Sequence, residues 1–172
     1  MRKTTTIIFG LAVALVVAAA AFASNGSSQT NAAKACKAER TAMGEQAFKL
    51  LYGTNANRSN AFGKCVSKHV RAEQQAVTNA SQTCRAERDT LGETAFNAKY
   101  GKNRNDHNAF GKCVSQHAKE TLADQQEETI KAAKACKAER ASLGAQAFRS
   151  KYGTNRNKAN AFGKCVSKQV HA

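Results

Sequence analysis

The chain has 172 residues, and its 27 lysines and arginines outnumber 12 acidic residues to give a net charge of +15. Proline is absent, which removes the commonest helix breaker and favours an all-α fold with long helices. The six cysteines include no CxxC pair, which argues against a zinc site.

A secretory signal peptide is predicted for residues 1–23. A short basic start precedes an apolar run over residues 7–22, and Ala23 ends a small-x-small cleavage site. The run is short for a membrane span, which needs roughly 20 apolar residues, and an uncleaved anchor is the alternative. We therefore expect a secreted, extracellular protein with no transmembrane span after signal cleavage. Residues 24–30 are expected to form a flexible leader.

A thirty-residue unit bounded by cysteines occurs three times, with a separation of 29 positions each time. The repeat favours closure of each unit on itself, although six cysteines allow many pairings. We define module 1 as residues 31–72, module 2 as residues 79–119 and module 3 as residues 131–172. The predicted disulfides are Cys36–Cys65, Cys84–Cys113 and Cys136–Cys165.

The disulfide of module 1 requires a break in its first helix. A straight helix over residues 31–52 would place Cys36 roughly 24 Å before the turn and Cys65 only roughly 8 Å after it. The sulfurs could not meet, because a disulfide needs α-carbons within about 7 Å. Gly44 lies between the cysteines and can adopt the left-handed conformation that ends helices. Gly92 and Gly144 occupy the same place in the other modules.

Three short helices per module follow from this break. In module 1 we predict helices over about 31–43 and 45–52 and a third that starts near residue 60, with Asn31 as the first N-cap. Asn60, Asn108 and Asn160 are candidate N-caps of the third helix, after a turn rich in glycine and asparagine. A calcium loop would need several carboxylates there, and only module 2 has one, Asp106.

A helical stripe of apolar residues recurs in each module and is interpreted as core rather than as a ligand groove. Its members are Met43, Ala47, Phe48, Tyr52, Phe62 and Val66, then Leu91, Ala95, Phe96, Tyr100, Phe110 and Val114, then Leu143, Ala147, Phe148, Tyr152, Phe162 and Val166. One module is too small to fold without a staple. Closing a thirty-residue loop contributes about 3.5 kcal/mol in the chain-entropy model.

The connectors between modules are rich in helix formers and are predicted to be helical. The first is the weaker prediction, because Thr78, Asn79 and Ser81 could interrupt it. The distance between corresponding cysteines is 48 residues from module 1 to module 2 and 52 from module 2 to module 3. The difference is about one helical turn, which favours a continuous helix because one added turn moves the next module along the axis with little rotation.

Basic charge is concentrated in the modules, whereas the connectors are acidic. Module 1 has eight basic and two acidic residues, module 2 seven and four, and module 3 ten and one, which gives +6, +3 and +9. Residues 73–78 carry −1 and residues 120–130 carry −4. Such modules attract polyanions; the alternative is a soluble surface whose sign is incidental.

No catalytic residue, cofactor or metal site is predicted, so the protein is not expected to be an enzyme. A recurring acid-arginine pair, Glu39-Arg40 in module 1, is interpreted as structural. His69 and His117 correspond, but module 3 has Gln169 there, so no histidine holds one place in all three copies. Oxidised cysteines would not act as nucleophiles.

The pattern C-[KR]-A-E-R-x3-G-x2-A-F-x3-Y-G-x-N-x-N-x2-N-A-F-G-K-C-V-S resembles repeats in uncharacterised secreted proteins of Gram-positive bacteria. The resemblance covers about residues 31–172 and implies no activity.

Two functional hypotheses remain. The first is a cationic repeat protein that binds an extracellular polyanion, which could be an anionic cell-wall polymer, a lipid surface or nucleic acid. The expected contacts are the basic residues of the asparagine-rich loops: Arg58, Lys102, Arg104, Arg156 and Lys158. The second is a structural or protein-interaction spacer with no specific ligand.

Overall fold

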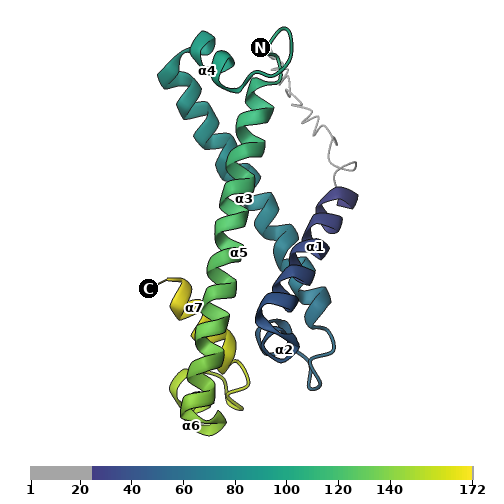
Figure 1. The fold of residues 1–172 in the computed structure, drawn as a ribbon, viewed down its shortest axis with the longest axis vertical. Coiled ribbons are helices and arrows are strands. Elements are labelled where there is room, and N and C mark those ends of the chain that lie inside the picture. The colour runs from purple at the N-terminus through teal and green to yellow at the C-terminus, as the bar shows by residue number, and fades with distance from the viewer. Residues whose placement is uncertain (1–24, 172) are drawn as a thin grey trace, which may run out of the picture.

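The computed structural model describes residues 25–171, which form seven α-helices and no strand (Figure 1). The helices are Asn25–Met43 (α1), Glu45–Tyr52 (α2), Ala61–Leu91 (α3), Glu93–Tyr100 (α4), Ala109–Leu143 (α5), Ala145–Tyr152 (α6) and Ala161–Val170 (α7). The predicted all-α class is confirmed. The signal peptide predicted for residues 1–23 lies outside the described residues.

Each module is three helical segments closed by one disulfide, as predicted. The bonds join Cys36 to Cys65, Cys84 to Cys113 and Cys136 to Cys165, with a Cα–Cα distance of 6.0 Å in each. Among the described residues no cysteine is left free. The three modules are therefore stapled independently of one another.

A single glycine separates the first two helices of every module. Gly44, Gly92 and Gly144 have φ of +87°, +76° and +77°, so the predicted positive-φ break is confirmed. Their ψ values of 152° to 158° place them in an extended region open almost only to glycine, rather than in the left-handed helical region. The amide of Gly44 still donates to Arg40 O, and its carbonyl accepts from the Phe48 amide, both at 3.0 Å. One residue thus ends α1 and starts α2.

The connectors are helical and continuous with the modules. Helix α3 runs for 31 residues through 73–78, and α5 runs for 35 residues through 120–130. The four-residue difference is the extra turn that the cysteine spacing predicted. Thr78 and Ser81 do not interrupt α3, because their hydroxyls donate to the carbonyls of Gln74 and Val77 one turn earlier.

One sequence prediction about helix starts is wrong and one is confirmed in position only. Residues 25–30, assigned to a flexible leader, form the beginning of α1, so Asn31 lies inside a helix and is not its cap. Asn60, Asn108 and Asn160 are the N-cap residues of α3, α5 and α7, as predicted, but their side chains make no capping bond. Their side chains are used in the preceding loops instead.

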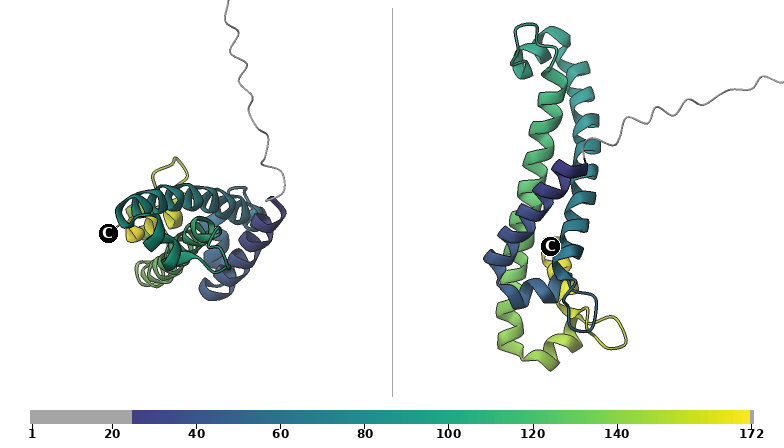
Figure 2. Two further views of the ribbon diagram at one scale, coloured as in Figure 1. Left: turned by 90° about the horizontal axis from the view of Figure 1, so that it is seen from above. Right: turned by 90° about the vertical axis from the view of Figure 1, so that its right-hand side faces the viewer.

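The two long helices fold the chain into a hairpin (Figure 1). Helices α3 and α5 run antiparallel side by side, and Ala76, Ala80 and Ala118 form a buried cluster between them. Small side chains let the two backbones approach closely. Module 2 lies alone at one end of the hairpin, and modules 1 and 3 lie together at the other (Figure 2).

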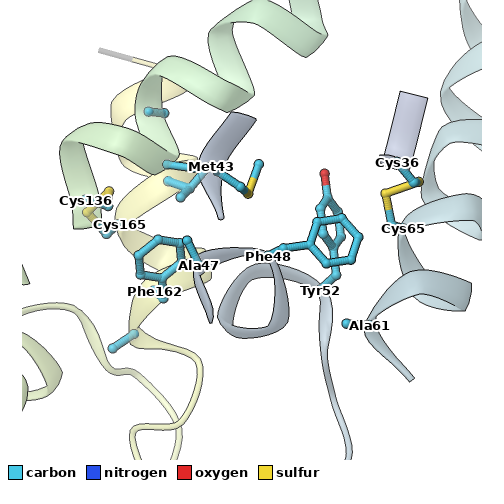
Figure 3. Close-up of a cluster of buried hydrophobic side chains, with 14 of the residues drawn as sticks. Cys36, Met43, Ala47, Phe48, Tyr52, Ala61, Cys65, Cys136, Phe162 and Cys165 are labelled. Atoms are coloured by element: carbon cyan, nitrogen blue, oxygen red, sulfur yellow. A yellow bond between two sulfur atoms is a disulfide. The ribbon is translucent and has the colours of Figure 1, made fainter. Parts of the chain in front are cut away.

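Modules 1 and 3 share one hydrophobic core. Helix α2 contacts α7 and α5 of module 3, whereas α4 and α6 contact only helices of their own modules. Met43 and Ala47 of module 1, each 2% exposed, belong to this core together with Phe162 and the Cys136–Cys165 disulfide, and Ala47 lies next to Phe162 (Figure 3). Phe48 and Tyr52 lie on the side of the Cys36–Cys65 disulfide (Figure 3).

The predicted core is therefore only partly correct. Leu91 and Leu143, the counterparts of Met43, are 43% and 42% exposed, and Ala95 and Ala147 are exposed as well. The reason is that a second module must cover this position to bury it. Module 3 covers it in module 1, and no other module covers it in modules 2 and 3. Phe48, Phe96 and Phe148 are each 1% exposed, because they pack inside their own modules.

Candidate polyanion-binding surface

The loop before the third helix is built around one asparagine. In module 1, Oδ1 of Asn60 accepts from the Thr54 amide at 3.0 Å, and its Nδ2 donates to Thr54 Oγ1 at 2.8 Å. Asn160 makes the same pair of bonds with Thr154. The side chain thus closes a seven-residue loop and holds the residue two positions before it, Arg58 or Lys158, at a positive φ. Hydrogen bonds thus define the conformation of the loops that carry these basic residues.

Arg58 has a structural role that the sequence did not reveal. Its Nη1 donates to the carbonyls of Lys49, Leu50 and Gly53 at 3.0 to 3.3 Å, and so caps the end of α2. Its Nη2 donates to the carbonyl of Ala159 in module 3 at 2.9 Å. A Cβ on Gly53 would collide with the Cβ of Arg58, so glycine is needed there for close approach. Arg58 thereby joins the loops of modules 1 and 3.

The other four predicted contacts are exposed but fall into two groups. Arg156 and Lys158 lie on the loop of module 3, beside the loop of module 1. Lys102 and Arg104 lie on the loop of module 2, at the opposite end of the hairpin (Figure 1). The structure does not bring the five predicted residues together into one site.

The recurring acid of module 1 is a buried hydrogen-bond acceptor. Glu39 is 1% exposed; the Tyr52 hydroxyl donates to it at 2.5 Å, and Nε2 of His69 lies 2.8 Å from it. Burial, and then the neighbouring carboxylate, raise the pKa of Tyr52, so the hydroxyl stays protonated and keeps donating. Glu39 holds α1, α2 and α3 together.

In the other two modules a lysine binds the glutamate that corresponds to Glu39. Lys99 lies 2.6 Å from Glu87, and Lys151 lies 2.6 Å from Glu139. The hydrogen bond from each lysine lowers the pKa of its glutamate, although burial opposes this shift. The structural interpretation of the recurring acid therefore agrees with its observed contacts in all three modules.

These contacts leave the docked end of the hairpin strongly cationic. Modules 1 and 3 together carry 18 basic and 3 acidic residues. The third acid, Glu45, lies 3.2 Å from Lys49 and 3.7 Å from Arg40. All three acids are thus engaged within their own modules, and the remaining basic charge faces solvent at one end.

The clustered cysteines and histidines cannot act as a thiolate metal site. Cys36, Cys65 and His69 have ligand atoms within 4.8 Å of one another, as do Cys84, Cys113 and His117. Both cysteine pairs are disulfides, and zinc binds the thiolate form. The histidines instead face the glutamates.

Sequence reasoning missed the docking of module 1 on module 3. A signal was present in α2, which has Leu50-Leu51 where the other copies have Ala98-Lys99 and Ser150-Lys151. Both leucines pack against the shared core. Modules with lysine at the second position use it to bind their own glutamate.

None of the helices within residues 25–171 has the length and apolar character needed to cross a bilayer. Comparison of the chain with protein-family models, curated proteins and solved structures finds no match.

Proposed function

We propose that this protein is a secreted, non-enzymatic protein that binds an extracellular anionic polymer through the docked pair of modules 1 and 3. The observation that carries the proposal is the distribution of charge: 18 basic residues against 3 acids that are already engaged. Three disulfides fit an oxidising compartment.

Docking supports this function because it joins two charged modules into one surface. Module 1 at +6 and module 3 at +9 act on the same stretch of polymer, while module 2 at +3 is held apart. Potentials from clustered charges add, and they raise the local concentration of an oppositely charged partner. The fixed loops present Arg156 and Lys158 at little entropic cost.

The test is binding of the oxidised protein to three probes: a phosphate-bearing cell-wall polymer, anionic lipid vesicles and duplex DNA. Binding driven by counterion release should weaken by roughly a thousandfold between about 50 and 200 mM salt if about six phosphates are contacted. We expect the cell-wall polymer to bind and DNA to bind without sequence preference. Binding that is indifferent to salt would contradict the proposal.

Two double variants test where the polymer binds. Arg156→Gln with Lys158→Asn removes two charges from the docked end, and asparagine tolerates the positive φ of residue 158. Lys102→Gln with Arg104→Gln removes the same charge from module 2. The first pair should lower affinity more than the second. Equal losses would show that overall charge, not the docked end, determines binding.

A spacer function is favoured by a different observation. Helices α3 and α5 are about 46 and 52 Å long at roughly 1.5 Å per residue, and they hold module 2 away from the docked end. Such a hairpin could separate two partners. No binding to any of the three polyanions at low salt would leave this alternative in place of the first.

A further inference from the structure

The docking of module 1 on module 3 brings together two distinct faces, which we call the donor face and the acceptor face. The donor face of module 1 comprises Met43 and Ala47 with Leu50 and Leu51 of α2. In module 3 the acceptor face comprises Ala133 of α5 and Phe162, Val166 and Val170 of α7. All eight residues belong to the shared core or pack against it.

Parts of both faces recur elsewhere in the chain. The donor face of module 3 keeps the apolar Leu143 and Ala147 but has Ser150 and Lys151 in place of the two leucines; it is exposed, and α6 contacts only α5 and α7.

The acceptor face of module 2 has no second module docked on it: Phe110 and Val114 are only partly buried, whereas their counterparts Phe162 and Val166 are 3% and 4% exposed. The difference arises because α2 of module 1 packs against α7, which carries Phe162 and Val166. Ala118 of the module 2 face is buried against Ala76 and Ala80 of α3.

The unoccupied acceptor face forms part of a groove of about 820 Å³ between α1, α3 and α5. The counterparts of Ala133, Phe162, Val166 and Val170 all line it: Ser81, Phe110, Val114 and Ala118. Val77, 43% exposed, lies in the same groove. A Cβ on Gly111 would meet nothing within 4 Å, whereas one on Gly163 would reach Leu51 O of the docked helix at 4.0 Å.

Charge selects α6 as the helix that complements this groove. Helix α6 has Arg149 and Lys151 and no acid, whereas α4 has Glu93 beside Lys99. One acid, Glu73, and one lysine, Lys119, line the groove, which continues along the acidic connector to Gln126. The four acids of residues 120–130 therefore lie on the helix that forms its wall.

We propose that the groove binds α6 of a second copy of this chain, in an antiparallel dimer. Module 3 of each copy lies against module 2 and the acidic connector of the other, so the same donor-acceptor contact forms twice about a twofold axis. This arrangement separates the two cationic ends, which a parallel dimer would bring together. It covers Leu143 and Val77, two of the three large exposed apolar side chains among the described residues.

Sedimentation velocity of the oxidised protein, without any polyanion, measures the association directly. We expect a monomer–dimer equilibrium at concentrations up to roughly 1 mM, the range of weak complexes. Amine cross-linking of a mixture of light and heavy isotope-labelled protein should join Lys151 of one copy to Lys119 in the groove of the other. A protein that stays monomeric overturns the proposal and leaves the groove to a different ligand.

Three exposed positions give matched variants that do not disturb the fold. Leu143→Asp on the donor face and Val77→Asp in the groove should each raise the dissociation constant of the dimer at least about tenfold, because each buries an unpaired carboxylate. Leu91→Asp is the control, since Leu91 is the counterpart of Leu143 in module 2 and is equally exposed but takes no part in the proposed dimer contact. Circular dichroism should show unchanged helix content for all three.

Mixing the two weakened variants distinguishes this contact from other dimers. The α6 of the Val77→Asp protein and the groove of the Leu143→Asp protein are both intact, so a mixed dimer has one complete contact. Association should therefore be stronger in the mixture than in either variant alone. A dimer that both substitutions leave unchanged, or that Leu91→Asp weakens equally, overturns the assignment of α6 to the groove.

Discussion

The docked pair of modules and the isolated module 2 are built from one repeat but differ in what stabilises them. Fifteen buried residues from modules 1 and 3 form a single core, whereas five form the core of module 2. Two of those five are the disulfide cysteines. The core of a single stapled module can thus consist of little more than Phe96, Tyr100 and one disulfide. The position occupied by residues 43, 91 and 143 is buried only where another module covers it.

The largest expected effect concerns the disulfides. Replacing Cys84 and Cys113 by alanine removes the staple of module 2, which contributes about 3.5 kcal/mol in the chain-entropy model. Hydrogen exchange of the variant should show that α4 loses its protection. Replacing Cys36 and Cys65 in the same way should leave more protection in α2, because module 3 still covers it. Equal loss in α2 and α4 would mean that docking does not stabilise module 1.

The next comparison uses one repeat position in two surroundings. Met43→Ala should lower the free energy of unfolding by about 3 kcal/mol, because a buried methionine leaves a cavity in the shared core. Leu91→Ala should change it by no more than about 0.5 kcal/mol, since that side chain is 43% exposed. Urea unfolding measures both. Similar values for the two variants would contradict the shared core.

The glycine breaks should respond less strongly. Gly44→Ala should destabilise the protein by about 1 to 3 kcal/mol, because alanine is strained at φ +87° and ψ 152°. Gly63→Ala is the matched control: Gly63 lies within α3 with nothing within 4 Å of an added Cβ, so alanine should stabilise by roughly 0.5 kcal/mol. Thermal unfolding of the two variants should shift in opposite directions. A neutral Gly44→Ala would show that the break tolerates other residues.

These comparisons also show what the sequence could and could not predict. The helix break at Gly44 and the pairing of Cys36 with Cys65 were predictable, because chain length and disulfide geometry leave few alternatives. The exposure of Leu91 was not, because the same position of the repeat is buried or exposed according to whether another module covers it. Leu50 and Leu51 carried a local signal of docking, as a departure from the repeat.

The loops show the same limit on a smaller scale. Asn60 has the residue type and position of a helix cap, yet its side chain bonds Thr54 instead. Arg58 was predictable as a basic loop residue, but its bond to Ala159 depends on the docking of module 3. The partner of Asn60 lies in the same loop and recurs in module 3 as Thr154, whereas the partner of Arg58 in module 3 is a long-range contact that the repeat does not encode.

The smallest expected effect is a pH dependence of module 2. The bond from Lys99 lowers the pKa of Glu87 below its ordinary value of 4.5, so this contact stabilises the fold above that pH and is lost as the pH falls through the lowered pKa. Glu87→Gln should therefore lower the stability of module 2 at about pH 7, and the difference from the unmodified protein should be smaller at about pH 3. Hydrogen exchange of α4 at the two pH values measures the gap. Glu128→Gln, an exposed acid of the connector, is the control and should show no such gap. No gap at either pH would assign the role of Glu87 to its bond with Tyr100, which a glutamine can still accept, rather than to its charge.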